Sequence, residues 1–390
     1  MRNLYRLLTG YCGWCFGQGL VIPWIVVYLV QVRNLSPLDA GFSLGAMSFG
    51  GGVALLFVAR WQDHVGHSRM RAFALVVHGM AIAGYFLASG PLMAIVVGAL
   101  AGAGAASVWN AFSVEMVMSG NERSNAQRFG LAFTLQNLGY GGGSLVSALW
   151  IHGGNHIFWP LFVAGAAVCW AWSVFTAMGW RYVTFSGMTP FPASKRSSSN
   201  LDMLFPTLVF GLFALMSTAF ATLLPLWITG PLTKGTSLVG WANSFSAGSV
   251  VVSQVLLGQR RHIKPRLFMV EGSALAYGMA FAIIGLAGTF LRGVWTSFGL
   301  FAGMCLVGIS EYLLNFSLPG LVNDRAREDR RSRNNAMVNL SWQVGSILGA
   351  PLAGAVITQG NWGWIIYVIL PWWLAVMGLT AGWRRLKSRF

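Results

Sequence analysis

Charged residues are scarce in this sequence: they make up 9% of its 390 residues, whereas soluble domains average about 25%. Hydrophobic residues make up 55% of the chain. The shortage of charge argues against a water-soluble enzyme. The abundance of apolar residues excludes an intrinsically disordered chain, which needs low hydrophobicity. This composition is typical of a protein that crosses a membrane several times.

Cysteine is also scarce, and its four residues all lie in apolar stretches, at Cys12, Cys15, Cys169 and Cys305. A disulfide framework is therefore not expected. Cys12 and Cys15 have CxxC spacing, but their apolar segment lacks the βαβ context of redox proteins. The sequence has no metal-ligand spacing, no phosphate-binding loop and no nucleophile–base set. We therefore predict neither a cofactor nor an enzymatic activity.

Long apolar runs dominate the chain, and a helix needs about 20 apolar residues to cross a bilayer. We predict an all-helical membrane protein with twelve transmembrane helices arranged as two pseudo-symmetric bundles. The predicted spans are 7–31, 38–59, 71–89, 91–117, 127–150, 157–180, 204–229, 238–258, 267–290, 293–319, 335–358 and 362–383.

Basic residues outnumber acidic ones, 26 to 10, and are distributed unevenly. All but Arg33, Lys234 and Arg292 fall at the termini or at loops on one side of the twelve spans. Cytoplasmic loops are rich in Lys and Arg, so both termini are expected in the cytoplasm. We expect a bacterial cytoplasmic (inner) membrane protein, in contact with lipid and monomeric. The basic residues form separate clusters, which argues against nucleic acid as a partner.

The chain divides at residues 181–203, its one long polar segment. We predict an N-terminal six-helix bundle over 1–180, a cytoplasmic linker over 181–203 and a C-terminal six-helix bundle over 204–390. The halves echo each other, since Leu138 and Gly139 reappear as Leu348 and Gly349 at an offset of 210. A parallel six-span repeat with substrate bound between the halves is a recurring transporter design.

The segment after the second span is similar to a known family motif, G-x-x-x-D-R-x-G-R-R, with Asp63 and Gly66 in place. On this motif and the span pattern, the whole chain resembles the major facilitator superfamily, in its twelve-span drug-efflux branch. The resemblance implies a gate in which the Asp caps a helix and pairs with Arg123 or Arg128. The chain has Ala59 in place of the Gly of the motif, and His64 and His67 in place of basic residues.

Two Gly-rich stretches, 136–143 in the fifth span and 345–354 in the eleventh, resemble the antiporter motif of efflux members. The first lacks the Pro of that motif. Small residues at this spacing serve either general helix packing or a bendable seam between the halves. The fourth span has no Arg in Gly98–Gly102, where proton-linked members usually carry one. Proton coupling would therefore need other residues.

Ionisable residues inside the membrane are candidates for function, because a charge there costs at least about 2.5 kcal/mol. Glu311 lies near mid-bilayer, 19 residues from Arg292 and 13 from Asp324. Glu115 lies nearer the cytoplasmic boundary. We predict these two residues for proton coupling or substrate binding. Alternatively, Glu311 is a neutral acid that hydrogen-bonds to a neighbouring helix.

Uncharged polar and aromatic side chains share the spans expected to line a central cavity. A few polar groups among aromatics suit an amphipathic or aromatic ligand. We find no buried Arg or Lys in the sequence pattern, which disfavours a strongly anionic substrate. The predicted cavity residues are Gln18, Trp24, Trp109, Asn110, Gln136, Asn137, Asn243, Asn315, Trp342 and Gln343.

These features predict a secondary transporter that works by alternating access and exports a small amphipathic or aromatic compound in exchange for protons. The direction of transport is implied by the resemblance. Uptake or facilitated diffusion of a neutral nutrient is the alternative, favoured by the missing Arg in the fourth span. A membrane receptor on a transporter scaffold is a second alternative.

Overall fold

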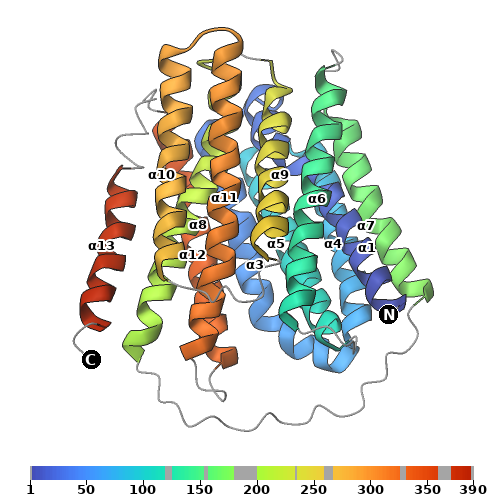
Figure 1. Ribbon diagram of the computed structural model, residues 1–390. Coiled ribbons are helices and arrows are strands. Elements are labelled where there is room, and N and C mark those ends of the chain that lie inside the picture. Colours follow the sequence, from blue (N-terminus) through green and yellow to red (C-terminus); the bar gives the residue numbers. More distant parts are fainter. Residues whose placement is uncertain are drawn as a thin grey trace.

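The computed structural model describes residues 2–118, 125–152, 157–179, 200–232, 235–258, 267–325, 331–358 and 370–387, and within these ranges all regular secondary structure is helical (Figure 1). The first span is a series of short segments: α1 (Arg2–Val21), η1 (Ile22–Trp24), α2 (Ile25–Val27) and η2 (Tyr28–Val32). The irregularity begins beside Pro23, which has no N–H to continue the hydrogen bonds of α1.

The remaining spans are single helices, and each overlaps a predicted one. They are α3 (Pro37–Val65), α4 (His67–Leu87), α5 (Pro91–Met118), α6 (Asn125–His152), α7 (Trp159–Gly179), α8 (Asn200–Thr229), α9 (Leu238–Gly258), α10 (Leu267–Phe290), α11 (Val294–Arg325), α12 (Arg331–Thr358) and α13 (Leu370–Lys387).

Among the described residues, nine spans are long and apolar enough to cross a membrane by composition alone. The other three are α6, α9 and α13. Since α6 and α9 pack against each other, part of their surface faces protein and not lipid. This explains why they can carry more Gly, Ser, Asn and Gln than their neighbours.

Helix α3 begins as the sequence predicts. The Ser36 hydroxyl accepts a hydrogen bond from the Asp39 N–H at 3.1 Å, and the Asp39 carboxylate accepts one from the Ser36 N–H at 3.2 Å. Pro37 occupies the first turn, where a missing N–H has no cost. The same helix ends at Gly66, whose φ of 91° is favourable only for glycine and lets α4 start immediately afterwards.

The two halves of the molecule repeat one packing scheme. In the N-terminal half (α1–α7), α3 packs on α5, α1 on α6 and α4 on α5. In the C-terminal half (α8–α13), the pairs six spans later do the same: α9 on α11, α8 on α12 and α10 on α11. The two bundles lie side by side in Figure 1. The predicted fold of two pseudo-symmetric six-helix bundles is therefore confirmed.

The offset of 210 noticed in the sequence has a structural meaning. A Cβ on Gly139 would lie 2.3 Å from the Cys12 carbonyl oxygen, and one on Gly349 would lie 2.1 Å from that of Leu215. Both glycines therefore let the fifth helix of a half approach its first helix closely. The predicted linker falls largely outside the described residues, so its boundaries remain predictions.

The halves meet along two helix pairs, α3 with α12 and α6 with α9, which we call the seam. Its contacts extend along the helices as far as Gly52 with Gln343 and Gly130 with Gln254, and they begin at the end of the bundle remote from the start of α1 and the end of α13 (Figure 1). There a Cβ on Gly354 would lie 2.4 Å from the Pro37 carbonyl oxygen, and Gln31 donates a hydrogen bond of 2.7 Å to Thr229. The halves are thus closed against each other at this end.

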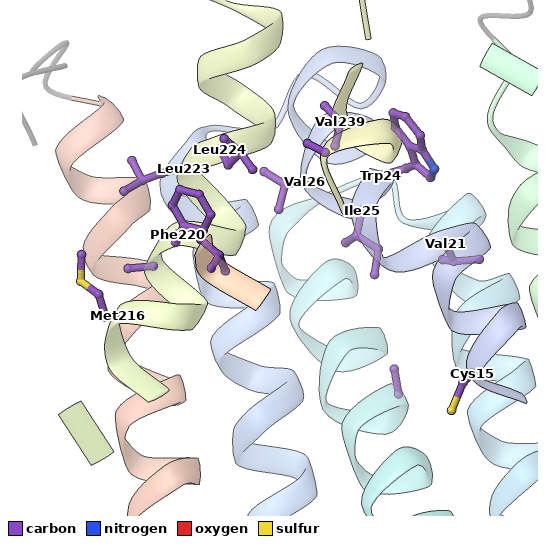
Figure 2. Close-up of a cluster of buried hydrophobic side chains, with 14 of the residues drawn as sticks. Cys15, Val21, Trp24, Ile25, Val26, Met216, Phe220, Leu223, Leu224 and Val239 are labelled. Carbon is purple, nitrogen blue, oxygen red and sulfur yellow. The ribbon is translucent and has the colours of Figure 1, made fainter. Parts of the chain in front are cut away.

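A buried apolar cluster supports the closed seam (Figure 2). It joins side chains of the first span to side chains of α8 and α9. The labelled members include Val21, Trp24, Ile25, Val26, Phe220, Leu223, Leu224 and Val239.

Candidate functional site

Glu311 lies in the middle of α11, 17 residues after Val294 and 14 before Arg325, or roughly 25 and 21 Å from the helix ends. Its neighbours fix the rotation of the helix. Ser310 and Ser273 of α10 bond to each other through their hydroxyls at 2.9 Å, and a Cβ on Gly308 would lie 2.2 Å from the Ser246 carbonyl oxygen of α9. The half-buried Glu311 is left to face the centre of the molecule.

Two tyrosines lie within electrostatic range of the Glu311 carboxyl group. Tyr277 belongs to α10, and its buried hydroxyl has no hydrogen-bond partner among the described residues. Tyr140 belongs to α6, in the other half. In the described part of the chain, Glu311 has no Arg or Lys partner, since the ion pairs found there involve Glu115 and Glu271. Glu311 is therefore an acid near the boundary of the halves that forms no ion pair with the described residues.

The predicted asparagines of the C-terminal half lie in the same region. Asn315 donates a hydrogen bond of 2.9 Å to the Glu311 carbonyl oxygen, one turn earlier on α11. Asn243 donates to the Val239 carbonyl oxygen at 2.9 Å and accepts from the Tyr140 hydroxyl at 3.5 Å. The Tyr140–Asn243 hydrogen bond crosses the seam. It brings Asn243, a predicted site residue, next to Tyr140, which was not predicted.

Glu115 has a different environment, inside the N-terminal half. It forms an ion pair with Arg71 of α4, and it accepts a hydrogen bond of 2.7 Å from the Ser68 hydroxyl. Arg71 also donates to Thr176 at 3.2 Å and lies 5.0 Å from the centre of the Trp172 ring, both on α7. The prediction that no Arg is buried is wrong, because Arg71 is 0% exposed. Arg71 is the first residue of the predicted span 71–89, so its burial was not expected.

An aromatic and amide group lies on the N-terminal half. The Tyr11 hydroxyl donates a hydrogen bond of 2.8 Å to Gln136, and the Tyr11 ring stacks on Phe112 with centroids 4.0 Å apart. Trp109, which is 39% exposed, lies 5.6 Å from the same tyrosine. Asn110 is turned away toward α3, where it donates to Gln62 at 3.0 Å. Gln136 and Trp109 thus share a neighbour, Tyr11.

The other predicted cavity residues are scattered. Gln18, Asn137 and Gln343 are half-buried, and Asn137 donates to the Phe133 carbonyl oxygen of its own helix at 2.9 Å. Trp342 packs on Phe210, with ring centroids 4.7 Å apart. Trp24 is 0% exposed and lies in the buried cluster of Figure 2, so it is not available to a ligand in this conformation.

The predicted gate is partly described. Arg128 is buried and donates a hydrogen bond of 2.9 Å to the Met116 carbonyl oxygen near the end of α5. Gly66 forms the turn between α3 and α4. Arg123 and the side chain of Asp63 lie outside what the structure describes, so the Asp–Arg pair remains a prediction.

A groove of about 480 Å³ lies elsewhere, between α3, α4 and α5. Its lining is mostly apolar and includes Phe57, Trp61 and Phe73, which are more than half exposed. None of the predicted site residues lines it.

Comparison with known proteins agrees with this architecture. The sequence model described as Major Facilitator Superfamily matches residues 7–315 and 207–389. No curated protein matches the chain significantly. Solved structures of similar fold include the nucleoside transporter NupG, at 14% identity and a TM-score of 0.72, with 97% of this chain and 99% of that chain covered.

Two further solved structures are similar over most of their length. A proton-dependent oligopeptide transporter structure shares 14% identity with a TM-score of 0.72, with both chains fully covered. A bacterial homologue of the human lysosomal transporter Spinster, in an inward-facing and occupied conformation, shares 12% identity with a TM-score of 0.70. There 92% of this chain and 82% of that chain are covered. At these identities the likeness establishes the fold alone.

Proposed function

Because the chain belongs to the major facilitator superfamily and is a transporter, we propose that it moves its substrate by alternating access and couples this movement to protons through Glu311. The supporting observation is the position of this acid: mid-helix, at the boundary of the halves and without a basic partner in the described residues. An intramembrane acid of this kind is suited to exchanging a proton for a substrate.

We infer that the end of the molecule bearing both termini faces the cytoplasm, because almost all basic residues are on that side. The end of the seam at Pro37 and Gly354 then faces outward, and we propose that this conformation is the inward-facing one. In this state a deprotonated Glu311 would attract a cationic or hydrogen-bond-donating group of the substrate. After the halves rock, a proton from outside would neutralise Glu311 and release the substrate.

The substrate we propose is a small amphipathic or aromatic organic compound. Trp109 offers a partly exposed aromatic surface, Gln136 shares the neighbour Tyr11 with it, and Glu311 offers an acid midway along α11. Arg71, the fully buried base, is paired with Glu115 inside the N-terminal half and is not available to an anionic substrate. Export is supported by the likeness to efflux motifs in the sequence.

Uptake or facilitated diffusion of a neutral solute is the second candidate, and the fourth span favours it. A Cβ at Gly98 would lie 2.3 Å from the Ser43 carbonyl oxygen, and one at Gly102 would lie 1.6 Å from that of Met47. The close packing of α5 on α3 leaves no room for an Arg at position 98. The chain therefore lacks one usual coupling group, and the nucleoside and oligopeptide transporters of similar fold make neutral and zwitterionic solutes worth testing.

The decisive experiment measures proton movement in energised, everted membrane vesicles challenged with lipophilic cations, neutral aromatic compounds, antibiotics and nucleosides. We expect a compound to collapse the pH gradient with the wild type, and Glu311→Gln to reduce this response at least tenfold. Glu271→Gln is the matched control, because Glu271 pairs with Arg384 of α13 far from the seam. Equal responses of wild type and Glu311→Gln would show that Glu311 does not couple. Equilibration of labelled neutral solutes without proton movement would favour the second candidate.

A further inference from the structure

The groove between α3, α4 and α5 exists because α3 and α4 diverge from the turn at Gly66 that joins them. Both helices pack closely on α5, but they have few contacts with each other. The floor between them includes the small residues Ala54, Ala74 and Gly104, which leave a hollow of about 480 Å³. The hollow therefore follows from the packing of the helices.

The groove opens away from the C-terminal half. Gly52 of α3 faces α12, because a Cβ there would lie 3.7 Å from a side chain of α12. Ala54 follows two residues later, about 200° round the helix. On the rim, Phe57 and Phe73 are 70% and 54% exposed, and Trp61 meets Phe73 edge-on with ring centroids 6.4 Å apart. Exposed apolar surface of this extent on membrane-spanning helices is a surface for lipid.

The length of the groove matches one leaflet of a bilayer. Its lining on α3 runs from Ala54 to His64, which is about 15 Å along a helix. The hydrocarbon core of a bilayer is about 30 Å thick, so one leaflet contributes about 15 Å. The end at His64 lies beside the Gly66 turn, on the side rich in basic residues that we assign to the cytoplasm. The groove thus has the length of an acyl chain of the cytoplasmic leaflet.

The chemistry of the groove changes along its length. Apart from His64, Ser107 and Trp61, the lining residues have no polar side chain, and the Ser107 hydroxyl is hydrogen-bonded within α5. Arg69 is exposed in the first turn of α4 and shares a face of that helix with Phe73, four residues later. In the described part of the chain, no acid lines the groove. Positive charge therefore lies at the headgroup end of an apolar floor.

We propose that this groove binds one anionic phospholipid of the cytoplasmic leaflet, with an acyl chain between α3 and α4 and the phosphate group beside Arg69. A guanidinium group suits phosphate, because its N–H groups form paired, charge-assisted hydrogen bonds with the oxygens. The lipid would join the two helices on either side of the Gly66 turn and so stabilise the N-terminal half. The inference goes beyond the proposed transport activity and does not depend on Glu311.

The test measures lipid binding to the purified full-length protein in detergent by native mass spectrometry. The probes are dioleoyl-phosphatidylglycerol, which is anionic, and dioleoyl-phosphatidylcholine, which has the same chains and no net charge. We expect the wild type to bind the anionic lipid about fivefold more tightly, the contribution of one basic residue beside an anionic headgroup. Arg69→Gln should abolish this preference, and Arg69→Lys should retain most of it. Arg6→Gln is the matched control, because Arg6 is exposed near the same end of the molecule but lies on α1.

Filling the groove tests the acyl chain separately from the headgroup. Ala54→Leu enlarges a side chain of the floor and should weaken the binding of both lipids by about fivefold or more, because the chain loses its close contacts. Ala171→Leu makes the same change at an exposed site on α7 and should have less than about a twofold effect. Thermal unfolding without lipid verifies that each variant is folded. With phosphatidylglycerol, the midpoint should rise for the wild type and Ala171→Leu but not for Ala54→Leu.

Several results would overturn the proposal. Equal binding of the two lipids by the wild type, or an equal loss with Arg69→Gln and Arg6→Gln, would show that Arg69 does not bind the headgroup. Unchanged binding by Ala54→Leu would show that no acyl chain occupies the groove. A dimer that persists at saturating lipid and is lost with Ala54→Leu would assign the groove to a second copy of the chain. The binding assay needs no transport, so its failure is distinguishable from failure of the proposed proton coupling.

Discussion

Helices α5 and α11 occupy equivalent positions in the two halves, and each carries one acid within the membrane. Both lie against the second and third helices of their half, α5 on α3 and α4, and α11 on α9 and α10. Glu115 on α5 is paired with Arg71 and bonded to Ser68, whereas Glu311 on α11 faces tyrosine hydroxyls at the boundary of the halves. Two equivalent helices of the repeat thus place a carboxyl group in two different environments.

The interaction partner of a buried acid, and not the burial itself, separates a structural role from a functional one. Arg71 and Ser68, which bind Glu115, both belong to α4, and Arg71 also donates to Thr176 of α7. These groups all lie in the N-terminal half, so they keep their places when that half moves as one body. Glu311 has a neighbour in each half, and one of them must leave when the halves rock. In the proposed mechanism a proton on Glu311 would therefore affect the conformation, whereas Glu115 joins helices within one half.

The largest effect is expected from Arg71→Met, which leaves Glu115 without its base. Removing one partner of a buried ion pair typically costs about 3–5 kcal/mol, because the other charge stays buried and uncompensated. The loss of stacking on Trp172 adds to this. Thermal unfolding of the purified protein in detergent measures the change. The double variant Arg71→Met with Glu115→Gln should recover part of the loss, and an unchanged midpoint for the single variant would contradict the ion pair.

The next prediction compares the same substitution, Glu to Gln, at both acids. Glu115→Gln should lower the free energy of unfolding by about 1.5–3 kcal/mol, since Arg71 and Ser68 lose a charged acceptor. Glu311→Gln should change it by less than about 1 kcal/mol, because no base is left unpaired there. Proton-coupled transport should show the opposite order, with Glu311→Gln the more damaging. Equal effects on stability would mean that the two environments do not differ as described.

The fold was largely predictable from the sequence. The lengths and spacing of apolar runs gave twelve spans and two halves, because a bilayer leaves a chain few alternatives to the membrane-spanning helix. The repeat at Gly139 and Gly349 was also visible, since close helix approach needs small residues. The break in the first span at Pro23 was missed, because hydropathy alone does not register a lost hydrogen bond.

The depth of the site residues in the membrane was predictable from the sequence, but their interaction partners were not. Counting residues along a helix identified Glu311 and Glu115 as membrane acids, because rise per residue depends only on sequence. Which helix faces which, and at what rotation, is decided by packing between distant segments. Arg71 was therefore counted with the basic residues at the cytoplasmic end of its predicted span, and Tyr140 was passed over inside a Gly-rich motif where the small residues drew attention. Tyrosines close to membrane acids on a seam helix would have been a usable signal.

Among the groups that bind Glu115, the smallest effect is expected from Ser68→Ala, which removes the hydroxyl that bonds Glu115 at 2.7 Å. Ser68 lies in the first turn of α4, next to the turn at Gly66. We expect a loss of about 1.5 kcal/mol in the free energy of unfolding, since its acceptor is charged. Ser173→Ala is the matched control in the same half, because Ser173 donates at 2.8 Å to the neutral Ala72 carbonyl oxygen. That variant should lose only about 0.5–1 kcal/mol. If Ser68→Ala and Ser173→Ala lower the free energy of unfolding equally, the acceptor of the Ser68 hydroxyl is not a charged Glu115. Glu115 and Glu311 would then differ in position alone.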